Sequence, residues 1–282
     1  MSDYIIRTMT QQELADYPLT WAEAEGWRPG VHDVDYFYPT DPSGFFLGVL
    51  DDEPIAAISG VKYGNNFGFV GLYLVKSEYR GQGYGFKIWQ HAIHSLAGRN
   101  MGLDGVIAQQ ANYQKSGFKI AHRNLRFETL GLGEKALDTD IIELNATHSF
   151  QVQQYDIPFY PADRQDFIQR WLNQKQGRAL GLIKNQVLTA YGVIRACHGG
   201  YRIGGWYADN KEQAEVLLLA LLHSVPLNSL VWIDMPEPNT DALALAEQYQ
   251  MTMVFEVARM YTGNFPTINL AKTFGNTTLE LG

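Results

Sequence analysis

A glycine-rich turn at residues 80–85 has the residue types and the spacing to bind an anion. It reads Arg-Gly-Gln-Gly-Tyr-Gly and stands between an apolar run at 67–75 and a helical pattern at 85–96. Glycines let the backbone turn tightly and approach a ligand, and the free N–H groups of a helix start favour negative charge. A pyrophosphate would fit such a turn. The segment matches neither the dinucleotide-binding fingerprint nor the GxxxxGK phosphate loop.

Apolar runs separated by turn residues predict the strands that position this turn. Runs at 45–50, 55–62 and 67–75 predict a three-stranded antiparallel meander. Before it, 4–6 predicts a strand and 10–25 a helix with a Thr10-x-x-Glu13 capping box. After the helix at 85–96 we expect a strand at 105–107, a short helix at 112–116 and a strand at 124–129.

The second half of the chain repeats this order of elements. We expect strands at 180–183, 187–195 and 201–207, a helix at 211–223, a strand at 230–235, a helix at 240–250 and a strand at 254–261. Two copies of one α/β unit are therefore predicted. Where the second copy would carry the glycine turn, it reads Gly-Gly-Trp-Tyr-Ala-Asp-Asn-Lys-Glu at 204–212, without the required glycine spacing.

Two stretches together resemble the GCN5-related N-acetyltransferases. Residues 72–85 are similar to the acetyl-CoA signature of that family, Arg/Gln-x-x-Gly-x-Gly/Ala after a splayed strand, and 113–118 are similar to its Tyr-x-Lys-x-Gly-Phe element. The resemblance covers 4–128, and the second half is similar to the divergent copy found in tandem members. It implies an α/β fold of two tandem units, each a mixed, mostly antiparallel sheet flanked by helices. The catalytic acetyl-CoA-binding domain is expected at 1–132, a linker at 133–149 and a divergent domain without the CoA signature at 150–282.

The resemblance also implies roles for individual residues. The backbone amides of the turn would cradle the CoA pyrophosphate, and the backbone of the preceding strand would bind the pantetheine arm. Tyr113 would protonate the departing thiolate, since a phenol can donate a proton as charge develops on sulfur. The expected cofactor-binding residues are Tyr73, Leu74, Val75, Arg80, Gly81, Gln82, Gly83, Tyr84, Gly85 and Phe86.

The base that removes a proton from the attacking amine is not identified by a motif. Asp33, His32, Asp35 and Glu25 lie in the segment that resembles the acceptor-binding region, and Asp33 is the preferred candidate. The chain departs from the family pattern at 108–113, Ala-Gln-Gln-Ala-Asn-Tyr, where members often place an Asn several residues before the tyrosine. Gln109 or Gln110 is expected to replace that Asn.

Other reactive side chains have simpler interpretations. His91 and His94 have a spacing that can ligate metal, but no further ligand set accompanies them, so no metal is expected. Cys197, the only cysteine, fits a buried small side chain better than a nucleophile. The aromatic residues Trp27, Tyr36, Phe37 and Tyr38 fit a substrate-pocket wall and core packing equally well.

Charge is distributed unevenly along the 282 residues. The net charge is −8, and residues 1–53 hold eleven acidic and two basic side chains, so the remainder is nearly neutral. An acidic chain disfavours nucleic-acid binding. The start resembles no signal peptide and no apolar run is long enough to span a bilayer, so a cytoplasmic protein without a membrane partner is expected. The oligomeric state is not predicted.

The resemblance implies an N-acetyltransferase that moves the acetyl group of acetyl-CoA to a primary amine by direct attack. The acidic segment coincides with the expected acceptor side, which favours a small cationic amine, although a solvated acidic face explains it equally well. The alternatives are a transferase for a longer acyl-CoA and a non-catalytic CoA sensor or protein-interaction module.

Overall fold

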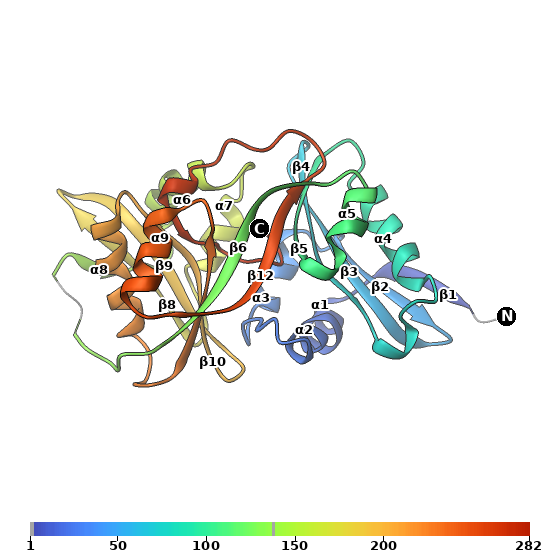
Figure 1. Ribbon diagram of the computed structural model, residues 1–282, viewed down its shortest axis with the longest axis horizontal. Helices are drawn as coiled ribbons and strands as arrows, with labels where there is room; N and C mark the ends of the chain where they lie inside the picture. Colours follow the sequence, from blue (N-terminus) through green and yellow to red (C-terminus); the bar gives the residue numbers. More distant parts are fainter. Residues whose placement is uncertain (1–2, 137–138) are drawn as a thin grey trace.

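The computed structural model describes residues 3–136 and 139–282, through which one continuous mixed sheet runs (Figure 1). From one edge to the other its strands are β1 (Tyr4–Thr8), β2 (Phe45–Leu50), β3 (Glu53–Tyr63), β4 (Phe67–Val75), β5 (Asn100–Val106), β12 (Thr252–Tyr261), β6 (Lys119–Leu130), β11 (Leu230–Pro236), β10 (Gly200–Ala208), β9 (Val187–Cys197), β8 (Gly177–Lys184) and β7 (Ile141–Glu143). A short strand, β13 (Thr273–Gly275), pairs with β10 beside this path. Most pairs are antiparallel, which confirms the predicted fold class.

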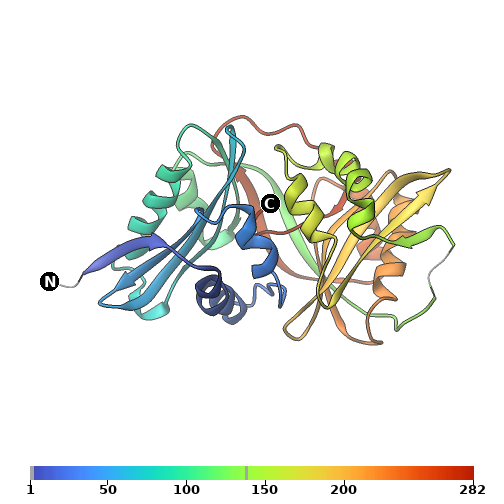
Figure 2. The same ribbon diagram turned by 180° about the vertical axis from the view of Figure 1, so that it is seen from behind.

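The helices cover both faces of the sheet. They are α1 (Gln11–Leu14), α2 (Thr20–Ala24), α3 (Val34–Phe37), α4 (Tyr84–Ser95), α5 (Gln110–Lys115), α6 (Ser149–Asp156), α7 (Gln165–Trp171), α8 (Lys211–Leu222) and α9 (Thr240–Gln248). Side chains of α4 pack on β2 to β5, and those of α8 and α9 pack on β8 to β11, in separate cores. On the opposite face, α1 to α3 and α6 to α7 share one core (Figure 2).

The segment predicted as one helix at 10–25 is interrupted. Thr10 and Glu13 form the expected capping box at the start of α1. A π-helical turn at Ala15–Leu19 then separates α1 from α2, and it contains Pro18. Proline lacks the N–H that a regular helix needs, so the helix widens there. Helix α2 then leads into the loop that holds Trp27.

The two halves repeat one arrangement, as the order of elements predicts. In the first, β4 and β5 are parallel neighbours with α4 between them in sequence, and in the second β10, α8 and β11 have the same relation. Each parallel pair is short, ending at Val70 with Leu103 and at Ile203 with Ile233. Beyond those residues the two strands of each pair separate.

The opening between β10 and β11 is filled by the chain itself. Strand β13 pairs with β10 at Trp206 and Tyr207. The next residue, Asn276, accepts a hydrogen bond from the Gly205 N–H and donates one to the Asp234 carbonyl oxygen, both at 2.8 Å. The start of α8 is also closed, because the Asn210 side chain accepts the Gln213 N–H at 3.0 Å.

The last long strand of each half crosses to the other half. Strand β6 pairs with β11 along Asn124 to Leu130, and β12 pairs with β5 along Gly102 to Val106. The two exchanged strands also pair with each other at the centre of the sheet (Figure 1). The predicted linker at 133–149 includes β7, and residues 137–138 of it lie outside the described residues.

Candidate active site

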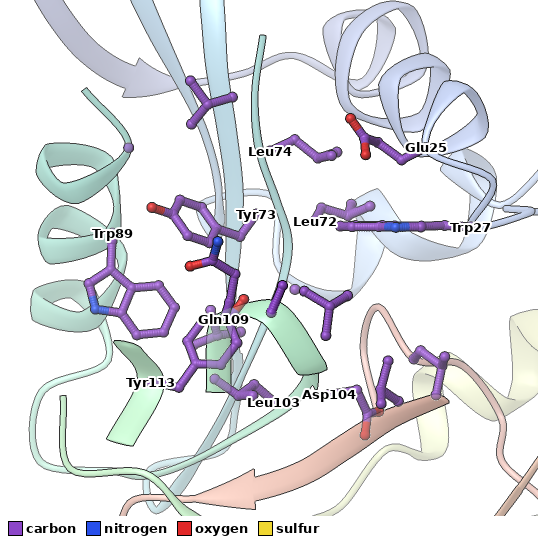
Figure 3. Close-up of a pocket in the computed structure, with 18 of the residues that line it drawn as sticks. Glu25, Trp27, Leu72, Tyr73, Leu74, Trp89, Leu103, Asp104, Gln109 and Tyr113 are labelled. Carbon is purple, nitrogen blue, oxygen red and sulfur yellow. The ribbon is translucent and has the colours of Figure 1, made fainter. Parts of the chain in front are cut away.

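A cavity of about 570 Å³ opens where β4 and β5 separate (Figure 3). Past Val70, the β4 register with β3 shifts, and Leu72 adopts a left-handed φ of 46°. Such a bulge turns a strand locally and frees it from regular pairing. The backbone of residues 71–75 therefore lines the gap on one side, and Leu103, Asp104 and Val106 line it on the other.

The glycine turn lies at one end of this cavity. Gly81 and Gly83 have φ values of 77° and 88°, a region in which glycine has no steric cost. Helix α4 begins at Tyr84, and no side chain of the described residues caps its first turn. The Lys87 N–H is bonded to the Gly83 carbonyl oxygen at 3.2 Å, so the amides before it are left for a ligand. These amides and the helix dipole suit a phosphate group.

Arg80 fixes the turn to its surroundings. Its Nε donates to the Val75 carbonyl oxygen at 2.8 Å, and its Nη2 pairs with Glu25 Oε1 at 2.5 Å. Both ends of that ion pair are about half exposed, and the pair joins the turn to the loop after α2. The Arg80 side chain is therefore ordered by protein contacts before any ligand arrives.

Tyr113 lies on α5 against the middle of the cavity. Its ring is 8% exposed and packs on Trp89, with ring centroids 5.2 Å apart. A side chain at Gly105 would overlap this ring, so the glycine makes room for it. Among the described residues nothing hydrogen-bonds the Tyr113 hydroxyl, although the residue lines the cavity. Burial raises the pKa of Tyr113 above 10, so the phenol keeps its proton.

Most of the sequence-predicted site residues meet around this cavity. Its lining includes Tyr73, Leu74, Val75, Arg80, Gly81, Gly83, Gly85, Phe86 and Tyr113. Figure 3 places Tyr73, Trp89 and Tyr113 on one side, across from Trp27 and Glu25. Gln82 and Tyr84 are not part of the lining. The Gln82 side chain donates to the Glu78 carbonyl oxygen at 2.9 Å, and the Tyr84 ring packs on Tyr4.

Asp33 is not placed to act as a base, which corrects the preferred candidate. It is fully buried outside the cavity lining, before α3. Arg195 donates to both carboxylate oxygens, from Nε to Oδ1 at 2.7 Å and from Nη2 to Oδ2 at 3.0 Å, and the Gly30 N–H also donates to Oδ2 at 2.7 Å. A carboxylate buried in this pair and outside the cavity is not accessible to a substrate amine. Of the other candidates, only Glu25 lines the cavity.

Gln109 lies in the cavity lining, where the departure from the family pattern occurs. Its Oε1 accepts a hydrogen bond from Asn112 Nδ2 at 2.8 Å. Gln110 instead begins the short helix α5. Gln109 is therefore the better placed of the two glutamines to contact a bound ligand.

The other end of the cavity is built jointly by both halves of the chain. Its wall contains Trp27, Phe255 and Val257 of β12, and Leu279 and Glu280 from the segment after β13. Of the aromatic residues with two interpretations, Trp27 lines the cavity, whereas Tyr36 and Phe37 pack on Trp171 in the core. This end is mainly apolar. Its charged side chains are those of Asp104, Arg126 and Glu280.

A buried network of charges crosses the sheet at this end. Arg126 of β6 donates to both oxygens of Asp234, at 2.7 and 3.0 Å. Arg202 of β10 donates to Asp234 Oδ2 at 2.6 Å and to Glu280 Oε1 at 3.0 Å. Burial alone would raise the pKa of Asp234, but Arg126 and Arg202 hold that pKa below its ordinary value. Asp234 therefore remains ionised, and each charged group of the network has an opposite partner.

Asp104 has a separate partner. Arg259 of β12 donates to both of its oxygens, at 2.8 and 2.7 Å, and Asn124 donates to Oδ1 at 2.8 Å. Burial raises the pKa of Asp104 although Arg259 opposes this change. The pair ties β5 to the exchanged strand β12.

These charged residues were not predicted as site residues. The signal that could have revealed them is a charged side chain inside an apolar strand, as in Leu-Arg-Phe at 125–127 and Trp-Ile-Asp-Met at 232–235. Buried charges require partners, so such interruptions indicate a network. The partners themselves come from distant segments, which local patterns do not reveal.

Comparison with known proteins places the chain in a family. Residues 6–118 match the model described as the acetyltransferase (GNAT) family, and residues 152–275 match a second model described as an acetyltransferase (GNAT) domain. A curated relative, holothin acyltransferase of Pseudoalteromonas sp. (strain SANK 73390), is 31% identical over 266 residues, covering 93% of this chain and 89% of the relative. The chain belongs to the GNAT acetyltransferase family. It is a tandem GNAT protein and an acyl-CoA-dependent N-acyltransferase.

Solved structures have the same fold as this GNAT protein. A putative acetyltransferase from Pyrococcus horikoshii superposes with a TM-score of 0.83 at 22% identity, covering 99% of this chain and 96% of that one. A tandem GNAT protein from the clavulanic acid biosynthesis pathway superposes with a TM-score of 0.63 at 13% identity, covering 94% and 100%. At these identities the likeness concerns the fold alone.

Two further features of this GNAT protein concern metals and membranes. Among residues 3–136 and 139–282, no group of three or more His, Cys, Asp or Glu side chains is arranged to hold a metal ion. Within the same ranges, no helix has the length and apolar character needed to cross a bilayer.

Proposed function

We propose that this chain transfers the acetyl group of acetyl-CoA to the primary amine of a small molecule. The observation that carries the proposal is one cavity that joins an uncapped, glycine-rich helix start to a tyrosine hydroxyl without a protein partner in the described chain. The turn fits a pyrophosphate, and the separated strands β4 and β5 leave room for an extended pantetheine arm beside β4.

The reaction then needs few groups from the protein. The lone pair of the amine nitrogen attacks the thioester carbonyl carbon, and backbone N–H groups at the β4 bulge stabilise the oxyanion. As the C–S bond breaks, Tyr113 gives its proton to the sulfur. The nitrogen releases its surplus proton to water, and solvent restores the proton of Tyr113. CoA and the N-acetyl product leave.

The second half supports the proposal of a single cofactor site per chain. Its equivalent opening holds β13, and its equivalent helix start is capped by Asn210. The Gly-x-Gly spacing is also absent there. The second half contributes instead to the acceptor end, through Phe255, Val257, Leu279 and Glu280.

The charge of the acceptor is the finer part of the proposal. A cationic amine is supported by the acidic segment and by Glu25 in the cavity lining. Many of the acids of that segment are paired, among them Glu13 with Arg7, Asp33 with Arg195 and Glu53 with Lys76. Steering of a cation requires kcat/KM to fall as salt rises. If kcat/KM for a cationic acceptor does not depend on salt, the proposed steering of a cation is wrong, and the proposal of acetyl transfer is unaffected.

The experiment is calorimetry with acetyl-CoA, followed by a transfer assay over small amines, polyamines, amino acids and peptides. Tight binding of one acetyl-CoA per chain and release of the CoA thiol with an amine are expected. No binding at millimolar acetyl-CoA contradicts the proposal. Binding of acetyl-CoA without turnover on any amine favours a CoA sensor. Faster turnover with a longer acyl-CoA than with acetyl-CoA favours a transferase for that longer acyl group.

A further inference from the structure

Two charged side chains at the acceptor end, Arg126 and Glu280, are arranged to bind different parts of one small molecule. Both line the cavity, and their side chains are 3% and 4% exposed, whereas the Asp104 side chain has no exposed surface. Glu25, the remaining carboxylate of the lining, is already paired with Arg80. Arg126 and Glu280 are thus two buried charged groups that border the acceptor end of the cavity.

Arg126 keeps hydrogen-bond donors free. A guanidinium has five N–H groups. Three are engaged within the described chain, two by Asp234 and one, from Nη1, by the Trp27 carbonyl oxygen at 2.7 Å. The guanidinium also stacks over Phe255 at 5.3 Å, which fixes its plane. The remaining N–H groups suit an oxygen acceptor on a ligand.

Glu280 keeps acceptor capacity. Its Oε1 is held by Arg202, and its Oε2 accepts only the Leu279 N–H, at 3.1 Å, among the described residues. A carboxylate oxygen can accept a second hydrogen bond. Because the contact with Arg202 orients the Glu280 carboxylate, Oε2 is a fixed acceptor for an N–H group.

The position of Glu280 next to β4 brings it near the expected reaction centre. A side chain at Gly71 would overlap the Glu280 carbonyl oxygen, so glycine is what lets this segment touch β4. The next residue of β4 is Leu72, where the strand bulges. An amine held by Glu280 therefore lies beside the part of β4 that is expected to bind the thioester.

We infer that the acceptor is a compact primary amine with a carbonyl or carboxylate oxygen close to the nitrogen. Glu280 accepts an N–H of the amine, and Arg126 donates to the oxygen. The apolar wall of Trp27, Phe255 and Leu279 accommodates the rest of the molecule. The inference rests on the proposed acetyl transfer.

Three amines with the same carbon skeleton around the nitrogen test this inference. Leucinamide carries a carbonyl oxygen and leucine a carboxylate, whereas 3-methylbutylamine carries no oxygen. The amines differ in basicity, so the readout is the change in relative kcat/KM that a variant causes. Arg126→Lys keeps a positive charge beside Asp234. It is expected to lower kcat/KM roughly tenfold or more for leucinamide or leucine, depending on which of the two the wild-type protein acetylates. It should change kcat/KM for 3-methylbutylamine less than about threefold. Glu280→Gln is expected to lower kcat/KM for all three by a similar factor of roughly ten.

Asp156→Asn is the matched control, since Asp156 forms a buried two-point pair with Arg164 outside this cavity. It should lower stability without changing the relative kcat/KM values. The Kd for acetyl-CoA of each variant reports whether the cofactor end is intact. An equal loss on all three amines in Arg126→Lys overturns the inference and leaves acetyl transfer standing. The inference is also overturned if wild-type protein binds acetyl-CoA but acetylates none of the three amines. Failure to bind acetyl-CoA counts against the proposed function itself.

Discussion

Asp33 and Arg195 form a buried two-point ion pair that joins the two GNAT units. Asp33 precedes α3 in the first unit and Arg195 lies on β9 in the second, and neither side chain is more than 1% exposed. The guanidinium also stacks over Trp171 at 4.6 Å. This geometry suits a structural pair, since both oxygens of the buried carboxylate accept hydrogen bonds from protein donors.

Replacing Asp33 by Asn should therefore reduce stability and spare catalysis. Breaking a buried pair leaves Arg195 uncompensated, and we expect a loss of about 3 kcal/mol in the free energy of unfolding. Urea unfolding measures it, and kcat/KM of the folded variant should stay within about threefold of wild type. Asp35→Asn, which removes a surface pair with Lys175, is the control and should cost less than about 1 kcal/mol. A folded Asp33→Asn protein without turnover would restore Asp33 as the base.

Tyr113→Phe should slow transfer more than it weakens cofactor binding. Loss of a proton donor to the leaving sulfur is expected to lower kcat roughly a hundredfold, with the Kd for acetyl-CoA changed less than about twofold. Tyr79→Phe removes a tyrosine hydroxyl outside the cavity, bonded to Glu53, and should leave kcat unchanged. Because burial raises the pKa of Tyr113 above 10, kcat should show no alkaline decline from this group below pH 10. An unchanged kcat in Tyr113→Phe would contradict the proton-donor role.

Gly83→Ala should weaken acetyl-CoA binding. Alanine at a φ of 88° is strained by about 1 kcal/mol or more, and relief of that strain distorts the turn. We expect the Kd for acetyl-CoA to rise about fivefold or more, because 1 kcal/mol corresponds to about that factor. Gly98→Ala is a matched control, with a φ of 82°, open space around it and a position after α4. Equal effects of both variants on the Kd would show that general strain, and not the turn, is responsible.

The phenol of Tyr63 should make stability depend on pH in the alkaline range. It donates to the Leu281 carbonyl oxygen at 3.1 Å, and burial raises the pKa of Tyr63 to about 12. The unfolded phenol ionises near 10, so its contribution is complete below pH 10 and is lost as pH rises from 10 to 12. Urea unfolding of Tyr63→Phe across this range should show a decline shallower than wild type by about 1.4 kcal/mol per pH unit. Parallel curves for the two proteins would contradict this.

The sequence predicted those parts of the site that depend on local pattern. Glycine spacing at Gly81 and Gly83, the capping box at Thr10 and the apolar runs of the meander all act within a few residues, and their positions agree with the structure. The acceptor end escaped prediction because Arg126 and Glu280 meet through Arg202 and Asp234, which lie far apart in sequence. Asp33 was assigned from its segment, and its partner Arg195 is 162 positions away.

The exchange of β6 and β12 has a consequence for how the chain folds during synthesis. Strand β5 of the first unit has β12 as its neighbour, so its pairs from Gly102 to Val106 form only after residues 257–261 have been made. Until then, one edge of β5 exposes unpaired backbone groups, and β6 has neither of its neighbours until β11 has been made. Such exposed edges are prone to associate with other chains. The first unit therefore cannot complete its sheet on the ribosome ahead of the second. We expect the two halves, expressed separately, to be insoluble alone and to recover acetyl-CoA binding only when produced together.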